Sequence, residues 1–156
     1  MKEGNEKLIE IPGKWEINYL YSAGRVASKF FQELKKNKRI MGTRCPGCKR
    51  VLVPPRSFCE RCFISLEDWV EVAQEGELDS FTIVLESFLG GVEPPYIVGF
   101  VKLNGADTGI ANFIKGIDLE DMKKAIERVK IGMKVRVAFK DIREGRVTDF
   151  FFEPVR

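Results

Sequence analysis

The sequence predicts a mainly β protein with a helical N-terminal arm. Three observations predict this class. The chain's four cysteines form two Cys-x-x-Cys pairs with ten residues between the pairs. Apolar residues before them recur at helical spacing, and much of the second half alternates between apolar and polar residues, as strands do. We expect three consecutive segments: a helical arm over residues 1–39, a metal-binding ribbon over 40–68 and a β-barrel domain over 72–156.

The arm is predicted from residues 14–38, where one helical face is apolar. Ser22 is the expected N-cap, and three lysines near residue 38 favour the negative end of the helix dipole. Such a face has to pack on the ribbon, on the following domain or on another protein. Its apolar residues are Ala23, Val26, Ala27, Phe30, Phe31 and Leu34.

The ribbon is predicted from the cysteine spacing. Each pair places two sulfurs on a tight turn, and two such turns supply four thiolates in a tetrahedron, which suits structural zinc. Pro46 and Gly47 predict the first turn, and residues 51–53 a short strand. Because the chain has no histidine, the site is expected to be all sulfur. We predict a rubredoxin-like zinc ribbon with Zn²⁺ on Cys45, Cys48, Cys59 and Cys62; the alternatives are iron, two disulfides or a redox pair.

The barrel is predicted from five strand patterns and one helix. A helix over 118–129 is expected to start at an Asp118 cap and to bury Leu119, Met122, Ile126 and Val129. Asn104-Gly105 predicts a hairpin turn. The order of three strands, helix and two strands predicts a five-stranded OB-fold barrel. The strands are expected over 77–84, 96–103, 107–114, 134–139 and 147–152.

Basic residues gather around the cysteines. Residues 35–61 hold nine lysines and arginines and one acid, so this segment carries +8 and the rest of the chain −5. Such a segment favours an anionic partner: nucleotide phosphates, nucleic acid or an acidic protein surface. The alternative is that these side chains offset the charge of a zinc tetrathiolate. The candidates for contact with an anion, CoA or a partner are Arg39, Arg44, Arg50 and Arg56.

The sequence also bounds compartment and activity. Residues 1–10 are charged and no apolar stretch is long enough for a membrane span, so we expect no signal peptide and no membrane association. Reduced cysteines then predict a cytoplasmic protein. Thioester condensation needs a nucleophilic cysteine and a base, commonly histidine. With no histidine and every cysteine assigned to metal, we expect that this chain is not an enzyme.

These motifs resemble a known family. The run Gly-Thr-Arg-Cys-Pro-Gly-Cys at 42–48, the Pro-Pro-Arg motif at 54–56, the second cysteine pair and the OB-like half resemble the zinc-ribbon/OB-fold acyl-CoA-associated proteins over nearly the whole chain. The resemblance implies a non-catalytic partner of thiolase-superfamily enzymes. Archaeal members look like scaffolds that join acetoacetyl-CoA thiolase to hydroxymethylglutaryl-CoA synthase, and relatives accompany steroid side-chain aldolases. The four cysteines carry over as metal ligands.

We therefore expect an accessory subunit that binds acyl-CoA, scaffolds a thiolase-type complex, or does both. The alternative is a single-stranded nucleic-acid-binding OB-fold protein, because zinc ribbons and OB-folds are both common in such proteins. A nucleic-acid face needs exposed aromatics among basic residues. The predicted strands carry more acids than bases there, with Phe81 and Phe113 as candidate stacking residues and core packing as their other interpretation.

Overall fold

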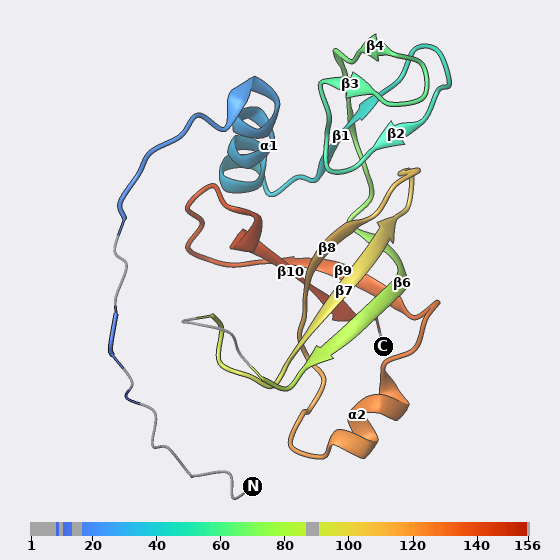
Figure 1. Ribbon diagram of the computed structural model, residues 1–156. Helices are drawn as coiled ribbons and strands as arrows, with labels where there is room; N and C mark the ends of the chain where they lie inside the picture. The colour runs from blue at the N-terminus through green and yellow to red at the C-terminus, as the bar shows by residue number, and fades with distance from the viewer. Residues whose placement is uncertain (1–8, 10, 14–16, 87–90, 156) are drawn as a thin grey trace, which may run out of the picture.

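The computed structural model describes residues 9, 11–13, 17–86 and 91–155. Within them a small ribbon and a helix sit at one end of a β-barrel, and a second helix lies at the other end (Figure 1). Part of the predicted arm, namely residues 1–8, 10 and 14–16, lies outside the described residues. The fold class predicted from the sequence, a zinc-ribbon-type segment followed by a five-stranded barrel, is confirmed.

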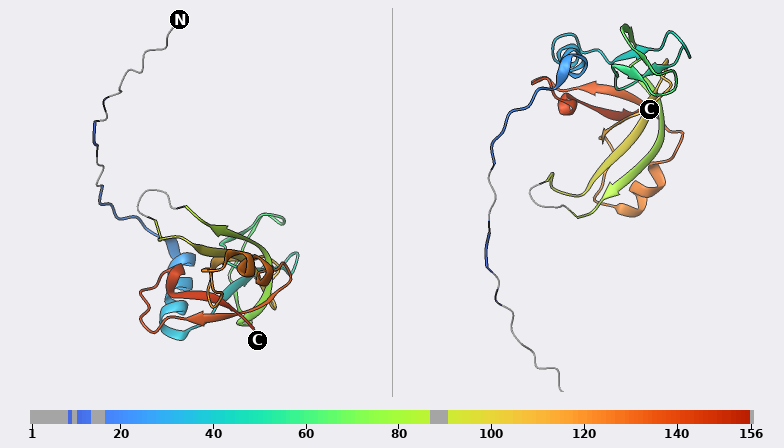
Figure 2. Two further views of the ribbon diagram at one scale, coloured as in Figure 1. Left: turned by 90° about the horizontal axis from the view of Figure 1, so that it is seen from below. Right: turned by 45° about the horizontal axis from the view of Figure 1, so that its top comes forward.

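Helix α1 (Gly24–Asn37) begins later than the predicted arm. Ser22 does accept a hydrogen bond from the backbone of the helix, through Gly24 N–H (3.2 Å), although the formal N-cap is Ala23. The helix buries Phe30 and Leu34 in a core that it shares with ribbon and barrel, so its apolar face packs within its own chain. Before it, residues 17–23 lead away from the body in all views (Figures 1 and 2).

The ribbon consists of short antiparallel strands. One sheet has the order β2-β1-β5, and β3 pairs with β4 in a separate hairpin. Lys29 of α1 places its Nζ 4.3 Å from the ring centroid of Trp69 in β5, which ties the helix to this sheet. The strands are β1 (Met41–Arg44), β2 (Val51–Leu52), β3 (Phe58–Cys59), β4 (Ile64–Ser65) and β5 (Asp68–Glu71).

The barrel closes in the order β10-β8-β7-β6-β9, which is the OB-fold order. Helix α2 (Met122–Arg128) follows β8 and lies at the end of the barrel far from the ribbon (Figure 1). The weakest closure is between β8 and β10, which share one parallel register pair, Phe152 with Ile114. The strands are β6 (Glu75–Val84), β7 (Tyr96–Leu103), β8 (Ile110–Ile114), β9 (Lys134–Phe139) and β10 (Phe150–Pro154).

The starts of α2, β8 and β10 differ from the predictions by three residues or more. The predicted cap Asp118 accepts from Glu120 N–H in a turn, whereas Asp121 caps α2 through Lys124 N–H (3.2 Å). The short helix therefore buries Ala125 and leaves Ile126 exposed, against the prediction. Residues 107–109 form no strand, so β8 begins at Ile110. Residues 147–149 form a 3₁₀ turn, η1 (Val147–Asp149), so β10 starts three residues later than expected.

Ribbon and barrel share one hydrophobic core. Ile40, Met41 and Val53 of the ribbon belong to the same buried cluster as Leu78 and Phe150 of the barrel. This continuity does not test the predicted boundaries at 39 and 72, which stay predictions. None of the helices in residues 17–86 and 91–155 is long and apolar enough to cross a membrane.

Candidate metal centre

The four cysteine side chains meet at the tip of the ribbon. Cys45 follows β1 and Cys59 ends β3, so each pair starts at the end of a strand. Both pairs then turn in the same way: Lys49 N–H donates to Cys45 O, and Phe63 N–H donates to Cys59 O, each at 2.9 Å. Lys49 and Phe63 have positive φ angles of 65° and 55°, the left-handed conformation that reverses the chain after each second cysteine.

The sulfur geometry fits one tetrahedral metal ion. All four Sγ atoms lie within 4.8 Å of one another, and the Sγ atoms of Cys48 and Cys59 are 3.7 Å apart. Four sulfurs bound to zinc at about 2.3 Å in a tetrahedron lie about 3.8 Å apart, close to this separation. The donor set therefore suits a metal ion. With four protein ligands no coordination position remains for a substrate, which is the mark of a structural site.

The protonation of the thiols is set by their closeness. Burial raises the pKa of Cys45, but the backbone N–H of Cys48 and the neighbouring thiols lower that pKa to about 6. The thiols of Cys45 and Cys48, together with burial, raise the pKa of Cys62 to about 12. The thiolate of Cys45 thus forms readily, whereas the neighbouring thiols oppose the loss of a second proton from Cys62. A cation at the centre removes this opposition because it stabilises every thiolate.

Neighbouring side chains hold the two cysteine turns in place. Cys45 and Cys59 are fully buried against Leu52 and Leu66. Close approach favours glycine at position 47, since a Cβ there would lie 3.0 Å from Cys62 Sγ, a tight contact. The conformation of the first pair is thus matched to the position of the second.

The four candidate arginines are each paired with a carboxylate of the same chain. Each guanidinium therefore already has a negatively charged neighbour. An incoming anion has to compete with them, and the assignment of these residues to anion contact stays a prediction. The pairs are Arg39 with Glu33 (2.7 Å) and Glu71 (3.3 Å), Arg44 with Asp68 (3.9 Å), and Arg50 and Arg56 with Glu60 (2.9 and 3.2 Å).

The Pro-Pro-Arg motif has a structural anchor that the sequence did not indicate. Thr43 is fully buried, and its Oγ1 donates to Arg56 O and accepts from Arg56 N–H, both at 2.9 Å. The backbone of the motif is thereby fixed to β1. The two candidate stacking residues, Phe81 and Phe113, are half-buried, and the ring of Phe113 packs edge-on against Tyr96 with centroids 5.5 Å apart.

Comparison with known families matches both parts of the chain. The family model described as the rubredoxin-like zinc ribbon domain of ChsH2 matches residues 33–67. The model described as the C-terminal OB-fold domain of ChsH2 matches residues 69–140. The two matches follow one another in the order that the structure has.

Similar proteins extend the comparison. A probable enoyl-CoA hydratase alpha subunit of Thermomonospora curvata is 30% identical over 106 residues, and the chain spans 31% of its length. The solved structure of an Ltp2-ChsH2(DUF35) aldolase contains a chain that is 26% identical, with a TM-score of 0.63 over 86% of this chain and 98% of that one. A Sulfolobus solfataricus protein of the DUF35 family is 25% identical, with a TM-score of 0.61 over 85% of this chain and 87% of that one.

These names correct the expectation that the chain is not an enzyme. Proteins similar to it are named as part of an aldolase and as a subunit of a hydratase, so relatives of this chain belong to enzymes. The expectation was wrong because it looked for a nucleophile and a base in one sequence. An enzyme made of several subunits can supply those groups from another chain.

Proposed function

Because this chain belongs to the family that joins a ChsH2-type zinc ribbon to a ChsH2-type OB-fold domain, we propose that it is an accessory subunit of an enzyme that acts on acyl-CoA thioesters. One observation carries the proposal: both parts occur together and in order, as in the Ltp2-ChsH2(DUF35) aldolase chain, which is covered over 98% of its length. The name of the hydratase relative also refers to an acyl-CoA substrate.

The partner we propose is a thiolase-superfamily enzyme. The motif resemblance supports an acetoacetyl-CoA thiolase working with hydroxymethylglutaryl-CoA synthase, and the names of the relatives support an aldolase or a hydratase as alternative partners. In this role the ribbon and the barrel provide a rigid surface to which the partner enzyme binds. The chain then contributes to catalysis as a subunit of the assembled enzyme. The cytoplasm is the proposed location, because four thiols of a metal site need reducing conditions.

The metal that we propose is zinc, on Cys45, Cys48, Cys59 and Cys62. Elemental analysis of protein purified without added metal should give about one zinc per chain, as expected for a closed four-sulfur site. Cys59→Ser removes one ligand and should lose the metal, whereas Ser57→Ala, two residues away and exposed, should retain it. Iron in place of zinc, or two disulfides and no metal, contradicts this assignment.

Assembly tests the function itself. The chain mixed with its cognate thiolase-superfamily enzyme should elute from a sizing column as one larger species that contains both. Binding to single-stranded DNA or RNA with a steep loss of affinity as salt rises, and with no enzyme partner, would replace this proposal by the nucleic-acid alternative. If the chain keeps its zinc but elutes separately after it is mixed with each candidate enzyme, the accessory role is contradicted.

A further inference from the structure

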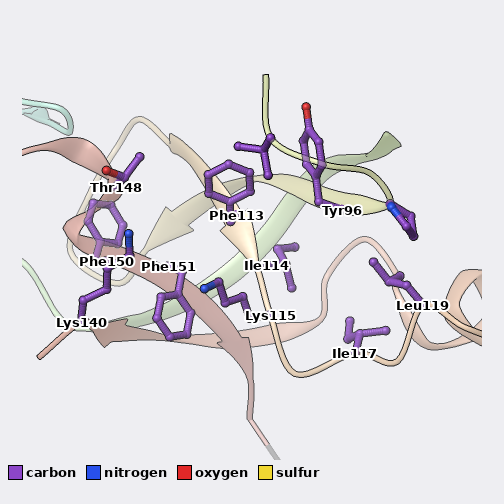
Figure 3. A pocket seen from close by; sticks show the side chains of 12 residues that line it. Tyr96, Phe113, Ile114, Lys115, Ile117, Leu119, Lys140, Thr148, Phe150 and Phe151 are labelled. Carbon is purple, nitrogen blue, oxygen red and sulfur yellow. The ribbon is translucent and has the colours of Figure 1, made fainter. Parts of the chain in front are cut away.

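An apolar groove opens on the side of the barrel. It has a volume of about 530 Å³, within the range of about 300–1,000 Å³ of small-molecule sites. Its walls come from the start of β7, the end of β8, the loop before α2, and β10 (Figure 3). Apolar side chains dominate the lining, among them Phe113, Ile117, Leu119 and Phe151. This groove is separate from the four cysteines, which lie at the tip of the ribbon.

The groove lies along β8 and β10, which do not pair along their length. Phe152 and Ile114 form their one register pair, and Lys115 N–H donates to Phe152 O (2.8 Å) just beyond it. Before that point the buried side chain of Asn112 donates from Nδ2 to Val147 O (2.9 Å), which lies in η1 just before β10. Along this stretch, β8 is thus joined to the turn before β10 by a side chain and not by further register pairs.

Two lysines give the groove a cationic end. Lys115 and Lys140 lie on either side of Phe151, while Ile117 and Leu119 lie toward the opposite end (Figure 3). Lys115 Nζ is 4.5 Å from the centroid of the Phe151 ring. Within residues 17–86 and 91–155, no carboxylate forms an ion pair with either lysine.

One acid near Lys140, Asp149, already has its hydrogen bonds made by the backbone. Asp149 feels the charge of Lys140, but its two carboxylate oxygens accept from the N–H groups of Glu144, Gly145 and Arg146. The two ammonium groups are thus available for an external anion.

From this arrangement we propose that the groove binds an amphiphilic anion, with its apolar chain toward Ile117 and Leu119 and its charged group between Lys115 and Lys140. An apolar wall removes the chain from water, and a pair of ammonium groups selects for negative charge at one end. A fatty carboxylate and an acyl-CoA thioester share this chemistry. The choice of acyl-CoA rests on the proposed function, whereas the groove and its charge do not.

Calorimetric titration of the full chain with dodecanoyl-CoA, dodecanoate and free CoA tests the proposal. At least one of the two amphiphiles should bind, and free CoA should bind more weakly than dodecanoyl-CoA because it has no acyl chain. Lys115→Ala/Lys140→Ala should weaken binding by about tenfold, a loss of one decade in Kd. Leu119→Asp, at the apolar end, should weaken it at least as much.

The matched control is Lys123→Ala/Lys130→Ala, which removes the same charge from exposed positions on and after α2, outside the groove lining. It should leave the affinity within about twofold, that is within ~0.4 kcal/mol. Zinc content and circular dichroism check that each variant is folded. The proposal is overturned if neither amphiphile binds, or if folded groove variants bind as tightly as the control. If an amphiphile binds but the chain does not co-elute with an enzyme, the groove proposal stands and the proposed function is contradicted. If the chain co-elutes with an enzyme but neither amphiphile binds, the proposed function stands and the groove proposal is overturned.

Discussion

Asp149 is the buried residue on which the loop after β9 depends. Its side chain is 3% exposed and accepts from three consecutive backbone N–H groups at 2.6–3.1 Å. That loop in turn rests on α1, since Arg143 Nε donates to Lys35 O (2.9 Å). One carboxylate thus holds a loop that fastens the helix to the barrel.

We expect Asp149→Asn to lower the free energy of unfolding by about 1–3 kcal/mol at neutral pH, because the amide turns an NH₂ toward backbone donors and leaves some unpaired. Burial raises the pKa of Asp149, but the three N–H bonds outweigh burial and lower it. Its contribution is therefore complete above the ordinary pKa of ~4 and is lost as pH falls through the lower, folded value.

Urea unfolding of both proteins from pH 7 into acid checks this linkage. The difference between wild type and Asp149→Asn should shrink as the pH falls. Asp141→Asn, a change at an exposed carboxylate on the same loop, should have little effect at any pH. A gap between wild type and Asp149→Asn that stays constant down to the lowest pH contradicts the role given to the charge.

At the scale of elements, strand β2 joins the ribbon to the barrel. Its backbone pairs with the loop between β7 and β8: Val51 N–H donates to Asp107 Oδ2, and Asp107 N–H to Val51 O, both at 2.8 Å. Two residues on, Thr108 Oγ1 accepts from Val53 N–H (2.7 Å) and donates to Val53 O (2.9 Å). A barrel loop is thus hydrogen-bonded to the edge of the ribbon sheet at and just after β2.

Thr108→Val keeps the shape of the side chain but removes both bonds to Val53. We expect it to cost about 1–3 kcal/mol, because a part-buried N–H and C=O are left without partners. The amide of Val53 should also exchange faster with solvent, which hydrogen exchange measures directly. Thr82→Val, at an exposed site on β6, is the control and should change neither quantity. Unchanged protection at Val53 in the Thr108 variant would mean that this junction is not held as described.

The elements also show what sequence patterns can predict. The bounds of β7 and β9 match the expected 96–103 and 134–139, because clean alternation marks a strand with one buried face. The start of α2 was misplaced because Asp118 and Asp121 both have the residue type of a cap, and only hydrogen bonding distinguishes them. The cysteine spacing predicted four thiols at one point, which the structure brings together.

Other features depend on contacts that a sequence does not contain. Arg39 meets Glu71 thirty-two positions away, and nothing local marks that pair. The groove likewise lies where β8 and β10 share one register pair, and the hydrogen bond from Asn112 to Val147 spans 35 positions. The ion pair follows from the pairing of β1 with β5 and the groove from the closure of the barrel, and neither follows from a local pattern.

For the whole molecule, the shared core couples the metal to the barrel. Ribbon residues Ile40, Met41 and Val53 pack in one cluster with Val101 and Phe152 of the barrel. Binding of structural zinc contributes on the order of 10 kcal/mol to folding in small zinc domains. If the ribbon loses its metal, the barrel loses the cover that the ribbon gives to its core.

Chelation should therefore destabilise the whole chain and not the ribbon alone. We expect a strong chelator to shift thermal unfolding to lower temperature. In a Trp15→Phe variant, where Trp69 of β5 is the remaining tryptophan, circular dichroism and tryptophan fluorescence should change together. Acid should act in the same direction, because protons compete with the metal for the four thiolates. Restoring zinc should restore the transition. A ribbon signal that melts well before the barrel signal would show instead that the two parts unfold independently, and that the shared core contributes little to their coupling.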